Sequence, residues 1–319
     1  MQTGESGKIT IGVSSCLLGN KVRFDGGHKH DRYITGTLGI FFDFVPVCPE
    51  VECGLPIPRE AMRLVGDPED PLFLTSRTGV DLTARISEWA KIRVEVLAKE
   101  DLCGFIFKNR SPSSGMERVK VYDKNNMPKA VGVGLFARAF KDRFPLIPVE
   151  EEGRLHDMIL RENFIESVFV YRRWRTVASE FTLDKLVHFH TDHKMLLRSH
   201  SEKHYRELGR IVAKAGTLET DELLTTYQDN LMAAMRLKPT IKKHTNVLLH
   251  IMGYFKKEIT SDEKQEILEI IERYRQHHVP LIVPITLMNH YVRKYNDAYL
   301  EKQYYLKPHP TELKLRNHA

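Results

Sequence analysis

The chain has 319 residues, of which 42% are hydrophobic and 28% are charged. This composition indicates a globular protein long enough for two domains, and four cysteines are too few for a disulfide scaffold. Residues 1–7 are polar and no apolar run of about 18 residues occurs, so we expect a cytoplasmic protein with no membrane partner.

The positive charge is concentrated in the second half of the chain. Residues 1–160 carry 22 Lys and Arg against 22 Asp and Glu, whereas the remaining residues carry 26 against 20 and so supply the whole net charge of +6. Twelve of the 15 histidines lie there as well. Such a basic half is typical either of solvated helix faces or of a domain that binds a polyanion, most naturally RNA.

The first half predicts alternating strands and helices. Strands are expected at residues 8–13, 42–47 and 102–107, helices at 34–41 and 81–99, and a hairpin up to about residue 78. This alternation predicts an α/β domain over residues 1–150 with a Rossmann-like parallel sheet. The ligand crevice of such a sheet lies just outside the carboxyl ends of its strands.

From about residue 148 the pattern becomes helical. Residues 150–153, three glutamates and a glycine, resemble an exposed junction. Amphipathic helices are predicted at 164–180, 182–215, 220–235, 241–255, 261–277 and 285–301, with Thr182 and Ser261 as capping residues. The second domain, residues 151–319, is therefore expected to be all-α.

Three turn-rich motifs follow predicted strands. They are Ser-Ser-Cys-Leu-Leu-Gly with Cys16, Pro-Val-Cys-Pro-Glu with Cys48, and Ser-Pro-Ser-Ser-Gly with Ser111 and Ser114. Cysteines from separate strand ends can converge on one point, and thiolates in a protein without an export signal favour iron–sulfur ligation over disulfides. Cys103, inside an apolar strand, is expected to be a buried core residue.

Taken in order, these motifs resemble the TudS-type thiouracil desulfidase domain over nearly all of residues 8–150. The segments that support the resemblance also include Val-Arg-Phe-Asp-Gly-Gly at residues 22–27 and Gly-Leu-Pro-Ile-Pro-Arg at residues 54–59. The second half, with His190-x-x-His193-Lys194 and His200-x-x-x-His204, is similar to the helical YbgA-like domain. A chain that joins the two resembles the RudS-type family of tRNA 4-thiouridine desulfidases.

The resemblance implies a [4Fe–4S] cluster held by three cysteines, with one iron left open to capture the sulfur of a thiocarbonyl without net redox change. Cys16 and Cys48 are then implied as ligands, and Ser114 stands where the family has the third cysteine. Glu50 is implied as general acid or base and Ser111 as a hydrogen-bonding or proton-relay group. The implied reaction converts 4-thiouridine in tRNA to uridine and releases hydrosulfide.

Ser114 leaves three explanations open, because an alcohol is a poor ligand for iron at neutral pH. The serine is a substitution that blocks turnover, or Cys53 or Cys103 replaces it as ligand, or serine itself ligates weakly. With only Cys16 and Cys48 as anchors, the cluster should be labile or absent and the chain inactive.

Other polar residues are candidates for substrate and RNA contacts. Arg23, Asp25, Arg59 and Lys108 adjoin the motifs and are expected to line the substrate pocket, with an Arg23–Asp25 ion pair as the structural alternative. A cationic stripe along one predicted helix is expected to hold an RNA backbone, and it consists of Lys194, Arg198, Lys203 and Arg206.

Three further alternatives stay open at this stage. The histidine pairs have spacings that suit zinc, but packing within the bundle or phosphate contact is favoured. Tyr205 and Trp174 are either base-stacking groups or core aromatics. As for function, the chain is a tRNA desulfidase, or a desulfidase of free thiouracil or thionucleosides, or a non-catalytic RNA-binding protein that has lost its cluster through Ser114. No protein partner is implied.

Overall fold

The computed structural model describes residues 7–317. The chain divides into two compact units, Met1–Asp157 and Met158–Ala319, so the division follows residue 157 rather than residue 150. Residues 1–6, which hold most of the polar N-terminal segment, and residues 318–319 lie outside the described part. Between residues 7 and 317, no helix combines the length and the apolar character needed to cross a bilayer.

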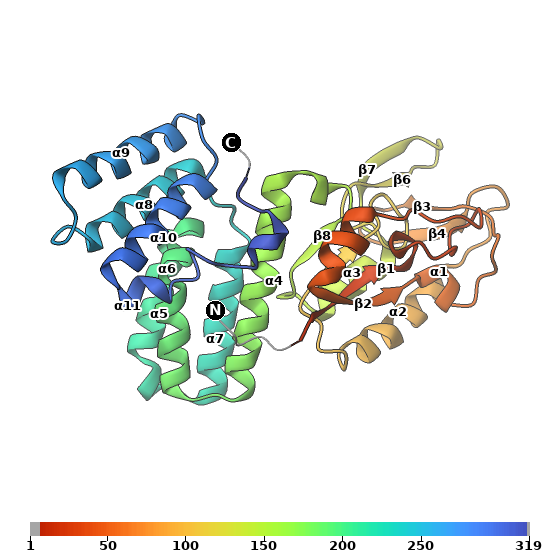
Figure 1. Ribbon diagram of the computed structural model, residues 1–319. Coiled ribbons are helices and arrows are strands. Elements are labelled where there is room, and N and C mark those ends of the chain that lie inside the picture. The colour runs from red at the N-terminus through yellow and green to blue at the C-terminus, as the bar shows by residue number, and fades with distance from the viewer. Residues whose placement is uncertain (1–6, 318–319) are drawn as a thin grey trace. The chain divides into compact units, whose positions relative to one another are not determined.

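The first unit contains the predicted parallel sheet. Its strands are β1 (Ile9–Ser14), β2 (Phe42–Val47), β5 (Phe105–Phe107) and β8 (Val149–Glu151), and they pair in the order β2-β1-β5-β8 with every pair parallel. Figure 1 labels β1, β2 and β8 of this sheet. The predicted helix at residues 34–41 is a π-helical turn, Tyr33–Thr37, followed by a 3-10 turn, Leu38–Ile40. The α/β class of this domain is confirmed.

Aromatic packing fixes the centre of this sheet. The ring of Phe105 on β5 packs against Phe136 and Phe140 of helix α3 (Leu135–Arg143), with centroid distances of 5.7 and 4.7 Å. The same ring lies 2.2 Å from the position that a Cβ would occupy at Gly12 on β1. Only glycine therefore fits at position 12, because a side chain there would collide with the aromatic core.

A second, mixed sheet completes this unit. It consists of β3 (Met62–Gly66), β4 (Pro71–Thr75), β6 (Val119–Tyr122) and β7 (Pro128–Gly132), in the order β4-β3-β6-β7, and β3 and β6 are parallel. Its buried side chains, including Leu64, Phe73 and Val121, pack with Ile86 of helix α2 (Thr83–Leu97). The sequence predicted only the β3–β4 hairpin, because β6 is short and most of β7 is exposed and lacks an alternating pattern.

The expected exposed junction at residues 150–153 is wrong. Glu150, Glu151 and Glu152 are 6%, 6% and 9% exposed. The first two belong to β8, and Glu151 accepts a hydrogen bond from the Met116 N–H at 2.7 Å, while Glu150 pairs with Arg154. Burial raises the pKa of both Glu150 and Glu151. The three carboxylates are therefore structural groups of the first unit.

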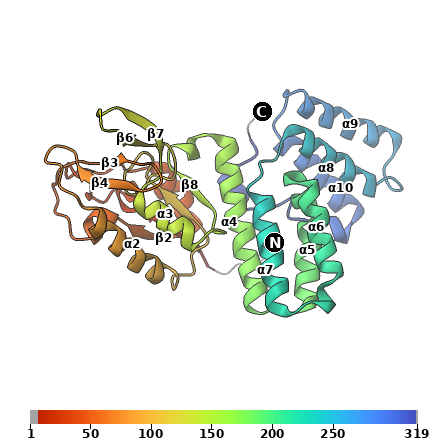
Figure 2. The ribbon, with the colours of Figure 1, turned by 180° about the vertical axis from the view of Figure 1, so that it is seen from behind.

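The second unit is helical, as predicted (Figure 2). Its helices are α4 (Met158–Ser179), α5 (Leu183–His200), α6 (Glu202–Ala213), α7 (Thr220–Met235), α8 (Ile241–Tyr254), α9 (Ser261–Arg275), α10 (Ile282–Tyr295) and α11 (Ala298–Glu301). Thr182 caps α5, as predicted, by accepting a hydrogen bond from the Lys185 N–H.

Four details of the helix prediction are wrong. The helix expected at 285–301 is broken, because Asn296 has a left-handed backbone conformation and ends α10 before α11 begins. The single helix expected at 182–215 is broken at Ser201, whose backbone is extended and whose hydroxyl caps α6 by accepting from the His204 N–H. Helix α9 is capped by Thr260 rather than Ser261, in a reciprocal capping box with Glu263. Helix α10 begins before Pro284, because proline in a first helical turn costs no backbone hydrogen bond.

A buried ionic network holds the C-terminal segment in the second unit. Arg316, 2% exposed, lies 2.8 Å from Glu166 and 3.3 Å from Glu162, both on α4. His200, at the end of α5, lies 2.8 Å from the other Glu166 oxygen. Although burial opposes ionisation, the His200 hydrogen bond and the Arg316 charge hold the pKa of Glu166 well below its ordinary value. Glu166 is therefore the anion that neutralises buried Arg316 most directly.

We expect Glu166→Gln to lower the free energy of unfolding of the second unit by about 3–5 kcal/mol, because it leaves the buried cation with one carboxylate fewer. In the parent protein, the stabilisation from Glu166 is present above pH 4.5 and is lost as the pH falls, since the folded-state pKa is lowered. The free energy of unfolding of the variant should therefore fall less than that of the parent protein as the pH is lowered.

Urea unfolding followed by Trp174 fluorescence in a Trp89→Phe background measures this effect, since the chain has two tryptophans. The matched control is Glu180→Gln, which removes an exposed carboxylate paired with Lys185 and should leave stability unchanged. Equal stability of both variants would show that the network contributes nothing.

Candidate active site

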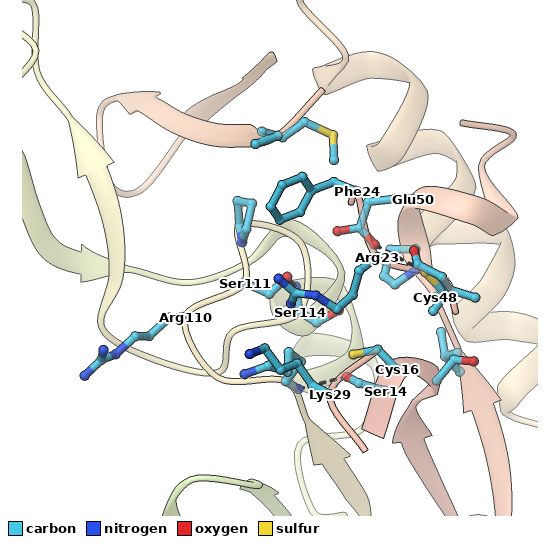
Figure 3. A pocket seen from close by; sticks show the side chains of 18 of the residues that line it. Ser14, Cys16, Arg23, Phe24, Lys29, Cys48, Glu50, Arg110, Ser111 and Ser114 are labelled. Carbon is cyan, nitrogen blue, oxygen red and sulfur yellow. Dashed lines mark hydrogen bonds between the residues drawn. The ribbon is translucent and has the colours of Figure 1, made fainter. Parts of the chain in front are cut away.

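The carboxyl ends of β1, β2 and β5 bring the three motifs together. Cys16 lies in the 3-10 turn Ser15–Leu18 after β1, Cys48 is the N-cap of the short helix α1 (Pro49–Glu52) after β2, and Ser114 lies in the loop after β5. All three line one cavity of about 370 Å³, here called the thiol pocket. Figure 3 shows Cys16, Cys48, Glu50, Ser111 and Ser114 gathered around it.

The loop at residues 111–115 is held rigidly by the start of α3. The Phe136 N–H donates to the Ser113 carbonyl oxygen at 2.9 Å, and the Gly134 N–H donates to the Gly115 carbonyl oxygen at 2.8 Å. A Cβ at Gly134 would lie 2.4 Å from the Ser113 backbone, so only glycine permits this approach. The hydroxyl of Ser114 is therefore presented from a fixed backbone.

Glu50 is part of the pocket wall and not a surface carboxylate. Its side chain is 12% exposed, and its two oxygens have different partners. Oε1 accepts a hydrogen bond from the Ser113 hydroxyl at 2.6 Å, whereas Oε2 lies 3.5 Å from the Cys48 sulfur and 3.8 Å from the Arg59 guanidinium. A carboxylate held in this way can accept or return a proton at the pocket.

Ser113 connects the two residues that the resemblance implied as catalytic. Its hydroxyl lies 3.0 Å from that of Ser111 and donates to Glu50, so the order is Ser111–Ser113–Glu50. Ser113 is fully buried and does not line the pocket itself. Sequence reasoning missed it, although the repeated serine of the Ser-Pro-Ser motif was the available signal.

Both pocket thiols are poorly ionised in the protein without metal. Burial raises the pKa of Cys16 to about 11, against the opposing charge of Lys108. Burial and the neighbouring Glu50 carboxylate raise the pKa of Cys48 to about 12. Because a metal binds the thiolate, ligation at this pocket must release protons and is favoured by higher pH.

Three of the four predicted substrate residues, Arg23, Arg59 and Lys108, line this pocket, and each has a protein partner. Asp25 does not line the cavity, and its half-exposed carboxylate accepts a hydrogen bond from the Gly27 N–H at 3.0 Å within its own turn. Arg23 lines the pocket and lies 3.5 Å from Asp25, so the structural alternative of an Arg23–Asp25 ion pair is present. The Arg59 guanidinium donates to the Val22 carbonyl oxygen at 3.0 Å. Lys108 is paired with Glu152, which also accepts from the Asn109 N–H at 2.7 Å.

Three further pocket residues were not predicted from the sequence. Phe24, 38% exposed, and the exposed cations Lys29 and Arg110 also line the cavity. In Figure 3, Arg110 points outward while Phe24 lies at the side of the pocket near Glu50. Phe24 belongs to the Val-Arg-Phe-Asp-Gly-Gly segment, but nothing in the sequence distinguished it, Lys29 or Arg110 as a pocket residue, since cations and aromatics occur throughout the chain.

Neither Cys53 nor Cys103 lines the thiol pocket. The Cys53 sulfhydryl donates to the Glu50 carbonyl oxygen at 3.3 Å, and Cys103 is fully buried beside β5. The open alternative in which one of them replaces Ser114 therefore has no support from the structure. Within residues 7–317, no group of three or more His, Cys, Asp or Glu side chains is arranged to hold a metal ion.

The cationic stripe expected on one helix is divided between two. Lys194 and Arg198 belong to α5, and Lys203 and Arg206 belong to α6, because Ser201 ends the first helix. Arg198 and Arg206 both pair with Glu202, at 3.0 and 3.1 Å, and Lys203 lies 3.9 Å from Glu207. These surface pairs reduce the net charge of the stripe.

Three of the four histidines in the predicted pairs pack within the bundle, and the fourth, His204, is half-buried. His190, His193 and His200 are buried, and their Nδ1 atoms lie next to the Tyr227 hydroxyl, the Phe189 carbonyl and the Leu237 carbonyl. Burial and the Lys194 charge lower the pKa of His190 to about 4.

Trp174 is a core residue, fully buried and stacked on Tyr227 at 4.7 Å. It is therefore not a base-stacking group.

Comparison with known proteins divides the chain in the same way. Residues 11–152 match the family model described as 2-thiouracil desulfurase, and residues 194–310 match the model "Protein of unknown function (DUF1722)". The first match places the first unit among the desulfurases and supports a desulfidase activity.

Two individual proteins are also similar. The Escherichia coli (strain K12) protein named "Uncharacterized protein YbgA" is 32% identical over 137 residues, which are 43% of this chain and 81% of that protein. A solved structure, "[4Fe-4S]-dependent thiouracil desulfidase TudS", is 28% identical and covers 48% of this chain and 97% of its own, with a TM-score of 0.39.

We expect Glu50→Gln to speed alkylation of Cys48 by iodoacetamide at pH 8 several-fold in protein purified without iron. Removing the carboxylate beside the sulfur lowers the pKa of Cys48 and increases its thiolate fraction. Peptide mass spectrometry measures the modification at each cysteine. Glu60→Gln, which removes a carboxylate paired with Thr78, is the control, and an equal rate in all three proteins would contradict the expectation.

Proposed function

Because this chain belongs to the family of the E. coli protein YbgA and its first unit is a 2-thiouracil desulfurase domain, we propose that it desulfurates 4-thiouridine in tRNA, giving uridine and hydrosulfide. The observation that carries the proposal is the thiol pocket, which combines two cysteines with the Ser111–Ser113–Glu50 chain. Thiols can hold a thiophilic metal group, while the polar chain supplies proton transfer.

The cofactor that suits this pocket is a [4Fe–4S] cluster, the group named for the similar solved desulfidase. Cys16 and Cys48 fit as ligands, because both are thiols that line the same cavity. Ser114 occupies the third position but fits poorly, since a hydroxyl ionises far less readily than a thiol. When bound, the cluster supplies an iron with affinity for the substrate's sulfur.

The chain's own residues would handle water and protons. Replacing C=S by C=O consumes one water, whose oxygen stays on the ring carbon and whose two protons leave with the sulfur as hydrosulfide and a proton, so no redox partner is needed. Glu50 is positioned to take a proton from water at Oε2, which faces the Cys48 side of the pocket. The Ser113 hydroxyl donates a hydrogen bond to Oε1 of Glu50, and the Ser111 hydroxyl can hydrogen-bond the thiolated nucleobase.

The preference for tRNA over a free base rests on the second unit. Residues 161–319 carry the whole net charge of +6, which suits a polyanion. Free thiouracil or a thionucleoside is the alternative substrate for the same pocket. A non-catalytic RNA-binding role is favoured by one observation, the serine at position 114.

We expect Ser114→Cys to take up about four irons per chain on anaerobic reconstitution, whereas the parent chain retains less than about one. A third thiolate completes the ligand set. Iron and sulfide analysis with visible absorption measures the difference. In the Ser114→Cys background, Cys16→Ser should lose the iron and Cys53→Ser should keep it, because Cys53 lies outside the pocket. If Ser114→Cys takes up no iron, the catalytic proposal fails.

In the Ser114→Cys background, we expect Glu50→Gln to lower kcat on 4-thiouridine-containing tRNA by about 100-fold or more, because it removes the proton acceptor. Ser113→Ala should lower kcat by about tenfold with little change in KM, since it only releases Glu50 and Ser111 from their fixed geometry. Hydrosulfide release measures turnover. Ser76→Ala, at an exposed site outside the pocket, should match the background, and a normal rate for Glu50→Gln would refute its role.

The substrate is tested by comparing kcat/KM for 4-thiouridine-containing tRNA with that for free 4-thiouracil in the same Ser114→Cys protein. We expect tRNA to be favoured by at least about tenfold, because phosphate contacts add affinity that a free base lacks. A preference for the free base would support the alternative desulfidase assignment. RNA binding without turnover would support the non-catalytic one.

A further inference from the structure

Five side chains with planar groups, from four helices, meet on the surface of the second unit. They are Arg198 of α5, Tyr205 of α6, His250 and Tyr254 of α8, and Tyr299 of α11, and they are called here the tyrosine patch. Tyr254 is 40% exposed, His250 is exposed, and Tyr205 and Tyr299 are half-buried. The patch is therefore accessible to solvent, while Tyr205 and Tyr299 are partly packed against the unit.

Ring contacts hold the patch together. Tyr254 and Tyr299 stack with centroids 5.2 Å apart and planes 21° from parallel, and His250 meets the Tyr254 ring edge-on at 5.5 Å. The Arg198 guanidinium lies 5.5 Å from the centre of the Tyr205 ring. Burial and the adjacent Tyr254 hydroxyl raise the pKa of Tyr299, and Tyr205 and Arg198 also act on it. The Arg198–Tyr205 pair is thus close enough to the Tyr254–Tyr299 pair for the two to interact electrostatically.

Positive charge adjoins these rings. Glu202 binds both Arg198 and Arg206, at 3.0 and 3.1 Å, so the two guanidinium groups lie on either side of one carboxylate. Burial and the Arg198 charge lower the pKa of His250. Two cations and one anion leave this edge of the patch with a net positive charge.

We propose that the tyrosine patch binds an unpaired base of tRNA by stacking on Tyr254 while Arg198 and Arg206 contact the flanking phosphates; this rests on the proposed tRNA function. Aromatic faces beside a cationic edge are the arrangement by which proteins bind single-stranded nucleic acid. Every base offers a face for stacking, whereas a paired base inside a helix does not. The patch should therefore engage a loop or an end of the RNA.

Charge favours RNA over a protein partner for this surface. Tyrosine and arginine are also common at protein interfaces, but the unit that carries the patch holds the chain's entire net charge of +6. The regularly spaced phosphates of a nucleic acid are attracted to this positive charge, whereas a typical protein surface carries charges of both signs and is attracted less.

The ring contribution is tested with an unmodified tRNA transcript, whose dissociation constant is measured by fluorescence anisotropy with the full-length protein. Tyr254→Ala should weaken binding about 5- to 50-fold, because one stacked base is lost. Tyr254→Phe keeps the aromatic face and should stay within about twofold of the parent protein. Val187→Ala, at another exposed apolar position of the same unit, is the matched control. A blunt RNA duplex should bind at least about fivefold more weakly than tRNA.

The charge contribution is tested by a variant that should strengthen binding. Glu202→Gln releases two guanidinium groups and should lower the dissociation constant about two- to fivefold. Glu272→Gln makes the same charge change beside Arg275 on α9 and should have a smaller effect. Arg198→Gln should reduce the salt dependence of binding, whereas Tyr254→Ala should weaken binding without changing that slope.

Two results would overturn the proposal while leaving tRNA binding intact: unchanged affinity in Tyr254→Ala, or equal losses in Tyr254→Ala and Tyr254→Phe. A parent protein that binds no tRNA would refute the proposed tRNA function and this surface together. Self-association lost in Tyr254→Ala during sedimentation, with RNA affinity unchanged, would assign the patch to a protein interface instead.

Discussion

Parallel pairing of β2, β1 and β5 is the constraint on which the candidate active site depends. Parallel strands that lie side by side end at the same edge of a sheet, so turns that are far apart in the sequence become neighbours there. Cys16, Cys48 and Ser114 reach one cavity for this reason, together with the contacts from α3 that hold the loop of Ser114. Gly12 and Phe105 maintain the arrangement, because the ring occupies the space that a side chain on β1 would need.

Buried carboxylates support both units, and in each case a neighbouring group compensates the cost of desolvation. After β5, Glu152 accepts a hydrogen bond from the Asn109 N–H and pairs with Lys108. Glu151 accepts a hydrogen bond from the Met116 N–H, just beyond Ser114. In the second unit, Glu166 and Glu162 neutralise Arg316 from the C-terminal segment. Removing one member of such a group costs more than the pair contributes, since it leaves an uncompensated charge inside the protein.

The backbone of the thiol pocket does not depend on which side chain stands at position 114, whereas metal binding in the proposed function does. Backbone hydrogen bonds from the start of α3 and the close approach of Gly134 fix the loop, and neither involves the side chain at position 114. The polar chain from Ser111 through Ser113 to Glu50 is complete as well. The backbone of the pocket is therefore held independently of the side chain at position 114, and under the proposed function its affinity for iron would depend on one atom there, oxygen in place of sulfur.

The sequence alone was enough to predict the α/β and helical classes, most helix positions, and the motifs of Cys16, Cys48 and Glu50, because periodicity and turn chemistry are local properties. It did not determine that Ser113 joins Ser111 to Glu50 or that Glu150–Glu152 are buried, since three consecutive glutamates look solvated until a sheet closes over them. The break at Ser201 and the meeting of Tyr205, Tyr254 and Tyr299 also required the tertiary structure. Only packing decides which residues from distant helices share a surface, because the spacing of residues along the chain carries no record of it.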